Sequence, residues 1–164
     1  MNTPEEKQEA WNRHWKAGHL SSLSSANQTT EAPEAFAAWE AFFSYFNTGA
    51  IILDIATGNG IVPALAQAHA KQHGKKLEIV AIDKADIDPE ETLKDNAEAV
   101  KGTLFIGGVE AEDLPFEDGW FDAITGQYAL EYTFTDRSIP EIGRVLKKDG
   151  IIRFVCHARD GVIV

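Results

Sequence analysis

The segment from Ile51 to Ile61, IILDIATGNGI, constrains the fold of this chain more than any other. A short apolar run ends there in an acid and then breaks into a small-residue turn that contains Gly58 and Gly60. A run of this length is typical of a strand that is buried on both faces. The residues after the turn are spaced as in a helix that packs on a sheet, so the segment predicts a strand, a tight turn and a helix. Such a turn, in which glycine lets backbone N–H groups approach a ligand closely, is half of a nucleotide-cofactor site.

Strands alternate with helices along the rest of the chain. We expect helices over residues 34–47, 61–73, 89–100 and 138–146 and strands over residues 51–55, 77–82, 104–106, 121–125 and 151–156. This alternation predicts an α/β fold with a mostly parallel, twisted sheet and helices on both of its faces.

The first 32 residues differ in composition from the rest. Pro4 to Lys16 predicts a short helix with Trp11 and Trp15 on one face, and the Ser/Thr/Asn-rich run after it predicts a loop or mobile segment. Two tryptophans on a polar helix need a surface to cover. We therefore expect residues 1–32 either to dock on the main domain, residues 33–164, or to close over a ligand as a lid.

Charge and cysteine content narrow the partners and the compartment. The chain has 26 acidic and 15 basic residues, and its formal net charge of −11 disfavours nucleic acid, because a polyphosphate would be repelled. Its one cysteine, Cys156, excludes an intramolecular disulfide and is expected to be a buried strand residue. The sequence shows no signal peptide and no membrane-spanning run, so we expect a cytoplasmic protein that does not enter a membrane.

Polar or glycine-rich clusters follow four of the predicted strands: Asp54 to Gly60, Asp83, Glu110 to Asp113, and Gln127 to Glu131. In an open parallel sheet, ligands bind beyond the carboxyl ends of the strands, where the strand order reverses. The Asp83 carboxylate suits the vicinal hydroxyls of a ribose. The loop after the third strand offers an acceptor, a backbone amide and an apolar shelf, which suit an adenine.

A dinucleotide is the competing cofactor for a Gly-x-Gly turn. Its fingerprint is GxGxxG, but the third position here is Pro63, which removes a backbone donor where a pyrophosphate would need one. A nicotinamide-dependent dehydrogenase is therefore the weaker alternative.

Three motifs in this order resemble those of class I S-adenosylmethionine-dependent methyltransferases, especially the small-molecule group: LDIATGNG at Leu53–Gly60, LPFEDGWFD at Leu114–Asp122 and RVLKKDG at Arg144–Gly150. The resemblance spans about residues 35–157. It implies a three-layer Rossmann-like methyltransferase fold, S-adenosylmethionine as cofactor, and in-line methyl transfer from the sulfonium to a small-molecule acceptor.

The resemblance assigns eight residues to the cofactor site: Asp54, Ala56, Gly58, Gly60, Asp83, Glu110, Ala111 and Gln127. The turn residues would cradle the methionine part, Asp83 the ribose, Glu110 with Ala111 the adenine, and Gln127 the amino acid part near the sulfonium. Ala56 departs from the family, which usually has glycine there, but it is still small.

Three residues are candidates for work on the acceptor: Tyr128, Glu131 and His157. Methyl transfer needs a nucleophile aligned with the carbon–sulfur bond, and a base helps when the acceptor is a hydroxyl or an acidic carbon. Glu131 is the candidate base or else a helix-start carboxylate, and His157 is a proton relay or else a surface histidine. We expect no metal, because no cluster of histidine and carboxylate shows ligand spacing.

The family fold has seven strands, and this sequence stops at Val164, so we expect a C-terminally truncated fold that lacks the last two strands. The final VIV could add one edge strand at most. An open, apolar edge on the fifth strand would recruit another chain, which predicts a homodimer through the region Ile151–Val164. The alternatives are a fragment of a longer protein and a cofactor-binding or interaction module without methyl transfer.

Overall fold

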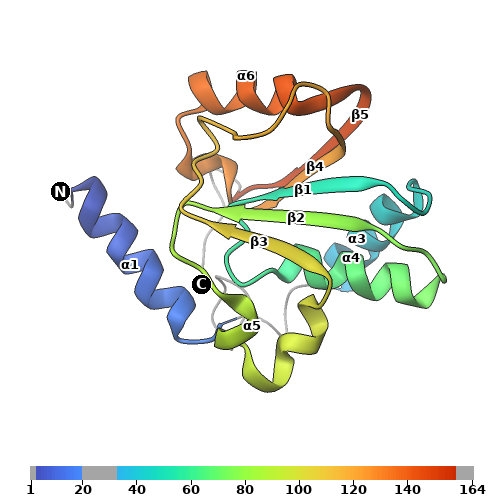
Figure 1. Ribbon diagram of the computed structural model, residues 1–164, viewed down its shortest axis with the longest axis horizontal. Coiled ribbons are helices and arrows are strands. Elements are labelled where there is room, and N and C mark those ends of the chain that lie inside the picture. Colours follow the sequence, from blue (N-terminus) through green and yellow to red (C-terminus); the bar gives the residue numbers. More distant parts are fainter. Residues whose placement is uncertain (1–2, 20–32, 158–164) are drawn as a thin grey trace.

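The computed structural model describes residues 3–19 and 33–157 and contains a five-stranded sheet of order β3-β2-β1-β4-β5, as Figure 1 shows. The strands are β1 (Ile51–Ile55), β2 (Glu78–Asp83), β3 (Thr103–Gly107), β4 (Phe121–Gln127) and β5 (Leu146–Val155). Every neighbouring pair is parallel. The chain builds outward from β1 to β3 on one side and continues with β4 and β5 on the other, so the strand order reverses between β1 and β4.

Helices cover both faces of this sheet, as the alternating pattern predicts. They are α1 (Pro4–Lys16), α3 (Pro33–Ser44), α4 (Ile61–Gln72), α5 (Pro89–Thr92) and α6 (Thr135–Val145), with short 3-10 turns η1 (Lys94–Val100) and η2 (Leu130–Tyr132). Helices α3 and α4 lie below the sheet in Figure 1 and α6 lies above it. The predicted three-layer α/β fold is confirmed.

Two apolar cores, one on each face, follow from the two-residue period of the strands. Ile52 of β1 packs with Trp39 and Phe43 of α3 in one core, and the next residue, Leu53, packs with Ile142 of α6 in the other. Successive side chains of a strand point to opposite faces, so β1 is buried on both. The apolar run that predicted this strand is therefore fully used in packing.

Two predicted elements differ from the structure. The helix expected over residues 89–100 ends after Thr92, because Lys94 adopts a left-handed φ of 49° that an α-helix cannot continue through. Residues 147–150 (KKDG), which separate the predicted helix 138–146 from the predicted strand 151–156, lie within β5 instead. There Leu146 pairs with Phe121 and Ile151 pairs with Ala123, so the intervening residues form a bulge.

The prediction for Cys156 was wrong, because β5 ends at Val155 and the cysteine beyond it is exposed. The Ser/Thr/Asn-rich segment after α1 and the proposed edge strand at Val162–Val164 lie outside the described residues.

None of the helices in residues 3–19 and 33–157 has the length and apolar character that a membrane span requires.

Candidate functional site

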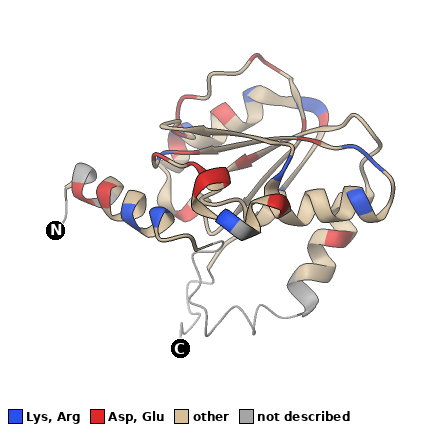
Figure 2. Cartoon of the chain, turned by 60° about the horizontal axis from the view of Figure 1, so that its bottom comes forward, with Lys and Arg blue, Asp and Glu red and all other residues tan. Residues whose placement is uncertain are grey.

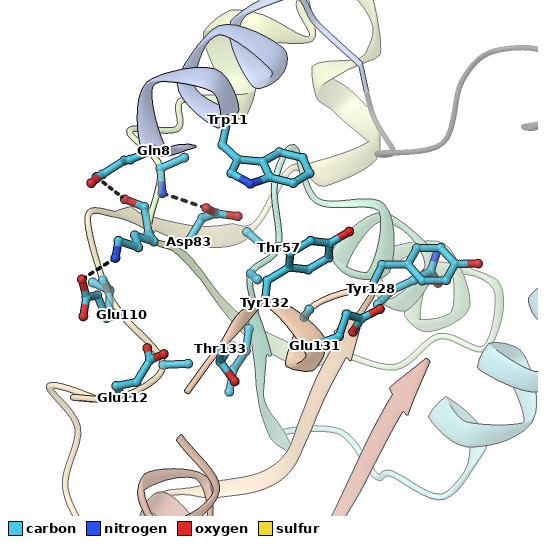
Figure 3. A pocket seen from close by; sticks show the side chains of 18 of the residues that line it. Gln8, Trp11, Thr57, Asp83, Glu110, Glu112, Tyr128, Glu131, Tyr132 and Thr133 are labelled. Atoms are coloured by element: carbon cyan, nitrogen blue, oxygen red, sulfur yellow. Dashed lines mark hydrogen bonds and ion pairs between the residues drawn. The ribbon is translucent and has the colours of Figure 1, made fainter. Parts of the chain in front are cut away.

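A pocket with a cavity volume of about 470 Å³ opens at the carboxyl ends of β1 to β4, next to α1 (Figure 3). Each of the four strand ends contributes neighbouring residues to its wall: 56–57 after β1, 83–85 after β2, 109–112 after β3 and 127–129 after β4. The size is that of a small-molecule site. The topological switch point and the polar strand ends thus coincide at one cavity.

The glycine-rich turn after β1 is held in an unusual backbone conformation. Gly58 and Gly60 have φ values of 56° and 89°, and Ala56 has 50° although it carries a Cβ. The buried Asn59 donates from Nδ2 to the carbonyl oxygens of Trp15 (2.9 Å) and His19 (2.7 Å). These bonds fasten the turn to the carboxyl end of α1.

Helix α1 docks directly on this turn and also forms part of the pocket wall. A Cβ added at Gly58 would lie 2.5 Å from the indole ring of Trp15, so the ring rests against the glycine. Trp15 stacks on Trp11 with ring centroids 5.7 Å apart, and both line the pocket together with Gln8. Of the two expectations for the tryptophan face, the described residues therefore show docking on the main domain.

Asp83 connects the end of β2 to the same turn. Its Oδ2 accepts from the backbone N–H of Gly58 and its Oδ1 from that of Ala85, both at 2.8 Å. Burial raises the pKa of this carboxyl, and the two N–H groups oppose that shift. Each carboxylate oxygen has a second lone pair, so Asp83 can still accept bonds from a ligand in the pocket.

Asp54 lies beneath the turn, outside the pocket wall, and only 1% of it is exposed. Burial raises its pKa to about 6, although the Thr125 hydroxyl donates to Oδ1 at 2.7 Å and lowers it. The carboxyl of Asp54 is therefore a polar group of the core that fixes β1 against β4.

The β3 side of the pocket carries an ion pair that the sequence did not suggest. Lys84 Nζ lies 2.8 Å from Glu110 Oε1, and the Lys84 carbonyl accepts from Gln8 Nε2 at 3.0 Å. Sequence reasoning overlooked Lys84 and Gln8. Lys84 directly follows a strand-end acid, and Gln8 precedes Trp11 and Trp15 by three and seven residues on one helical face.

Tyr128 and Glu131 line the β4 side, and His157 contacts both of them without lining the pocket. The rings of His157 and Tyr128 stack with centroids 4.2 Å apart. Glu131 Oε1 accepts from the His157 backbone N–H (3.0 Å) and lies 2.8 Å from its Nδ1. Burial alone would raise the pKa of Glu131, but the bonds from His157 outweigh it and hold that pKa below its ordinary value.

Arg144, the first residue of the RVLKKDG motif, bonds to the LPFEDGWFD motif. Its guanidinium donates to the carbonyl oxygens of Leu114 (2.9 Å) and Phe116 (2.8 Å), and Glu141 accepts from the Leu114 N–H. The bond from Arg144 to Glu141 is the main reason that the pKa of Glu141 falls to about 2. Arg144 therefore fixes the LPFEDGWFD loop, whose first residues follow the Glu110–Asp113 segment.

The structure thus brings seven of the predicted site residues to the pocket wall: Ala56, Asp83, Glu110, Ala111, Gln127, Tyr128 and Glu131. Asp54, Gly58 and Gly60 shape the turn without lining the wall, and His157 lies beside it. Gln127 Oε1 also accepts from the Trp39 indole N–H at 2.9 Å, which fixes its position at the end of β4.

Comparisons with known proteins give one family. Residues 53–154 match the model of a methyltransferase domain. A 2-phytyl-1,4-naphtoquinone methyltransferase of Trichormus variabilis is 38% identical over 102 residues, which are 60% of this chain and 43% of that protein. A demethylmenaquinone methyltransferase of Symbiobacterium thermophilum is 32% identical over 115 residues, 69% of this chain and 44% of that protein. The chain spans less than half the length of these curated relatives.

Solved structures show the same fold. The YcgJ protein of Bacillus subtilis superposes with a TM-score of 0.61 at 26% identity over 77% of this chain and 53% of that one. A SAM-dependent methyltransferase from Aquifex aeolicus gives a TM-score of 0.58 at 21% identity over 84% and 76%, which bears on the fold alone. With a methyltransferase domain match over more than half of its length and a fold shared with solved methyltransferases, this chain belongs to the class I S-adenosylmethionine-dependent methyltransferases.

Proposed function

We propose that the pocket binds S-adenosylmethionine and that the chain transfers the cofactor's methyl group to a small, partly apolar acceptor. The observation that carries this proposal is the convergence of four strand ends on one cavity of suitable size, with the Asp83 carboxylate on its wall. The sulfonium methyl of the cofactor is already electrophilic. The protein then has to orient the acceptor and exclude water.

For the cofactor, we assign the roles that the family motifs suggest. Asp83 would accept from the ribose hydroxyls through its remaining lone pairs, and Glu110 with Ala111 would contact the adenine. The turn at Ala56, Gly58 and Gly60, supported by Asp54, would take the methionine part, with Gln127 near the amino acid group. Trp15 rests on Gly58, so contact of the methionine part with Gly58 requires α1 to shift. This supports the role of residues 1–32 as a lid on the domain formed by residues 33–164.

For the acceptor, we propose an aromatic, quinone-like molecule. Relatives that are 32–38% identical are named as naphthoquinone and demethylmenaquinone methyltransferases. The wall between α1 and η2 is aromatic: the Trp11 and Tyr132 rings meet edge to face with centroids 5.8 Å apart. Glu131 would take a proton from the acceptor, with His157 bonded to it as a relay and Tyr128 in contact with the acceptor.

We also propose a cytoplasmic homodimer that binds neither nucleic acid nor a membrane. The net charge of −11 opposes polyphosphates, and Lys and Arg are spread over several elements of the described chain, as Figure 2 shows. Among the described residues, β5 has a strand neighbour on one side only, and Ile151 and Ile152 on it are 39% and 46% exposed. Such an edge supports pairing with a second copy.

Calorimetric titration with S-adenosylmethionine tests the cofactor assignment. Asp83→Asn removes the charge and one acceptor atom, so we expect about 10- to 100-fold weaker binding, as for loss of a buried hydrogen bond to a charged group. Asp149→Asn, at an exposed position on β5, should bind like the unmodified chain. Equal affinity of the Asp83 variant, or tighter binding of a nicotinamide dinucleotide, would overturn the assignment.

A transfer assay with labelled S-adenosylmethionine and a naphthoquinone acceptor tests the activity. We expect labelled methyl in the acceptor. Cofactor binding without transfer to any of a panel of small metabolites would contradict methyl transfer and favour a binding module.

A further inference from the structure

A second polar cluster lies at the contact between α3 and α4. Glu40 of α3 faces His69 and His73 of α4, and its Oε1 lies 2.8 Å from both His69 Nδ1 and His73 Nε2. One ligand atom from each residue lies within 4.8 Å of the others. Ile61, at the start of α4, lines the cofactor pocket, whereas His69 is roughly 12 Å further along that helix at 1.5 Å per residue. The cluster is therefore separate from the candidate active site.

The two helices fix this geometry. His69 and His73 are four residues apart, so they lie on the same face of α4, a spacing that zinc proteins use for paired histidine ligands. Glu40 follows Trp39, which is 1% exposed in the core between α3 and the sheet, so its backbone is held in place. The expectation of no metal overlooked the histidine spacing, and the carboxylate comes from another helix that sequence spacing cannot reveal.

His69 is the unusual member of the cluster. Its side chain is 1% exposed, and within the described residues neither ring nitrogen has a hydrogen-bond partner. Nδ1 is close to Glu40, but the pair lacks hydrogen-bond geometry. A buried imidazole without partners is costly, and coordination of a cation by one of its nitrogens would remove that cost.

The cluster is also accessible. A shallow hollow of about 320 Å³ reaches Glu40 and His69 between Phe36, Leu65 and Gln72. A hydrated ion can enter there, and water has room beside Glu40 and His69.

We propose that Glu40, His69 and His73 form a divalent metal site, with zinc as the best-fitting ion, that ties α3 to α4. Two imidazole nitrogens and one carboxylate oxygen are a zinc ligand set, and water completes the tetrahedron. Bonds of about 2.0–2.2 Å place tetrahedral ligand atoms roughly 3.3 Å apart, so the two 2.8 Å contacts need only a small opening of the cluster.

Zinc binding to the chelator-stripped full chain tests this site. We would titrate zinc against a chromophoric competitor and compare the unmodified chain with Glu40→Gln and His73→Gln, which alter partly exposed side chains and spare the buried His69. Glu78→Gln and His19→Gln make the same changes at exposed positions outside the cluster. We expect one zinc per chain in the unmodified protein and both controls, with at least tenfold weaker binding in the two cluster variants.

Two further readouts separate a real site from surface binding. Cobalt in place of zinc should give the intense visible absorption of a four-coordinate ion, and zinc should raise the thermal unfolding midpoint of the unmodified chain but not of His73→Gln. Absence of saturable binding, or cluster variants that bind zinc like the controls, would overturn the proposal. A cluster variant that unfolds already without zinc is recognised by its circular dichroism spectrum, and the other variant then decides.

Discussion

At the scale of single residues, the Ile51–Ile61 segment contains a buried acid, Asp54. Asp54 is almost fully enclosed and its pKa is raised to about 6, so the folded chain keeps this proton to higher pH than the unfolded chain does. Between about pH 4 and pH 6 the Asp54 carboxyl is ionised in the unfolded chain but still protonated in the folded chain. The free energy of unfolding therefore falls as pH rises through this range. Above pH 6 the full cost applies, about 3 kcal/mol for a shift of roughly two units.

The variant Asp54→Asn should therefore be more stable than the unmodified chain at pH 7.5, by about 1–3 kcal/mol. Asparagine keeps an oxygen for the Thr125 hydroxyl and carries no charge. The advantage should shrink at pH 4, where Asp54 is protonated in the folded state. Urea unfolding at both pH values measures the difference, and an advantage that does not change with pH would contradict the raised pKa.

Glu131 is the residue whose assigned role depends most on its neighbours. His157 donates to it and holds its pKa low, so it is ionised at neutral pH. If it acts as the base, Glu131→Gln should lower kcat by about 10²–10⁴-fold while cofactor affinity changes little. Single-turnover kinetics with the naphthoquinone acceptor would measure this, and unchanged turnover would remove Glu131 from the chemistry.

Sequence reasoning found the residues that sit at strand ends, because the end of a parallel strand is recognisable from its apolar run. Asp83 and Glu110 are examples. It did not find Lys84, whose role comes from its ion pair with Glu110 in the pocket wall, or the cluster of Glu40, His69 and His73, whose carboxylate lies on another helix. Such contacts depend on packing between elements, which one sequence does not reveal.

At the scale of elements, α1 and the glycine-rich turn form one unit through Trp15, Asn59 and Gly58. The variant Gly58→Ala would place a methyl carbon 2.5 Å from atoms of the Trp15 ring, which is a steric clash, and would strain a left-handed backbone position. We expect α1 to detach while the sheet stays folded, with at least tenfold faster hydrogen exchange in residues 4–16. Gly143→Ala in α6, where nothing lies within 4 Å, should leave that exchange unchanged. Protection of α1 in the Gly58 variant would contradict the contact.

Some elements were easier to predict than others. The helix Pro4–Lys16 has a capping box between Thr3 and Glu6, and the strand Ile51–Ile55 is a plain apolar run, so both were predicted with their exact bounds. The break at Lys94 was missed, since no glycine or proline stands at that position. Residues 147–150, which end in Gly150, were predicted as a turn, and the structure has a bulge within β5 there.

At the scale of the whole molecule, the exposed edge at β5 leads us to expect a homodimer. Light scattering coupled to size-exclusion chromatography should show a dimer at micromolar concentration. A lysine on an edge strand blocks pairing, so Ile152→Lys should shift the mass to the monomer. Leu104→Lys on the opposite edge strand β3, where the leucine is 58% exposed, should leave the dimer intact. A clean monomer of the unmodified chain would contradict the assembly.

We infer that four strand ends and α1 enclose one adenosyl and methionyl site. A crystal structure of the chain with S-adenosylhomocysteine tests it most directly. We expect the ribose hydroxyls within hydrogen-bond distance of Asp83, the adenine beside Glu110 and Ala111, and Trp15 moved away from Gly58. A ligand bound on any other surface, or a ribose that does not contact Asp83, would contradict it.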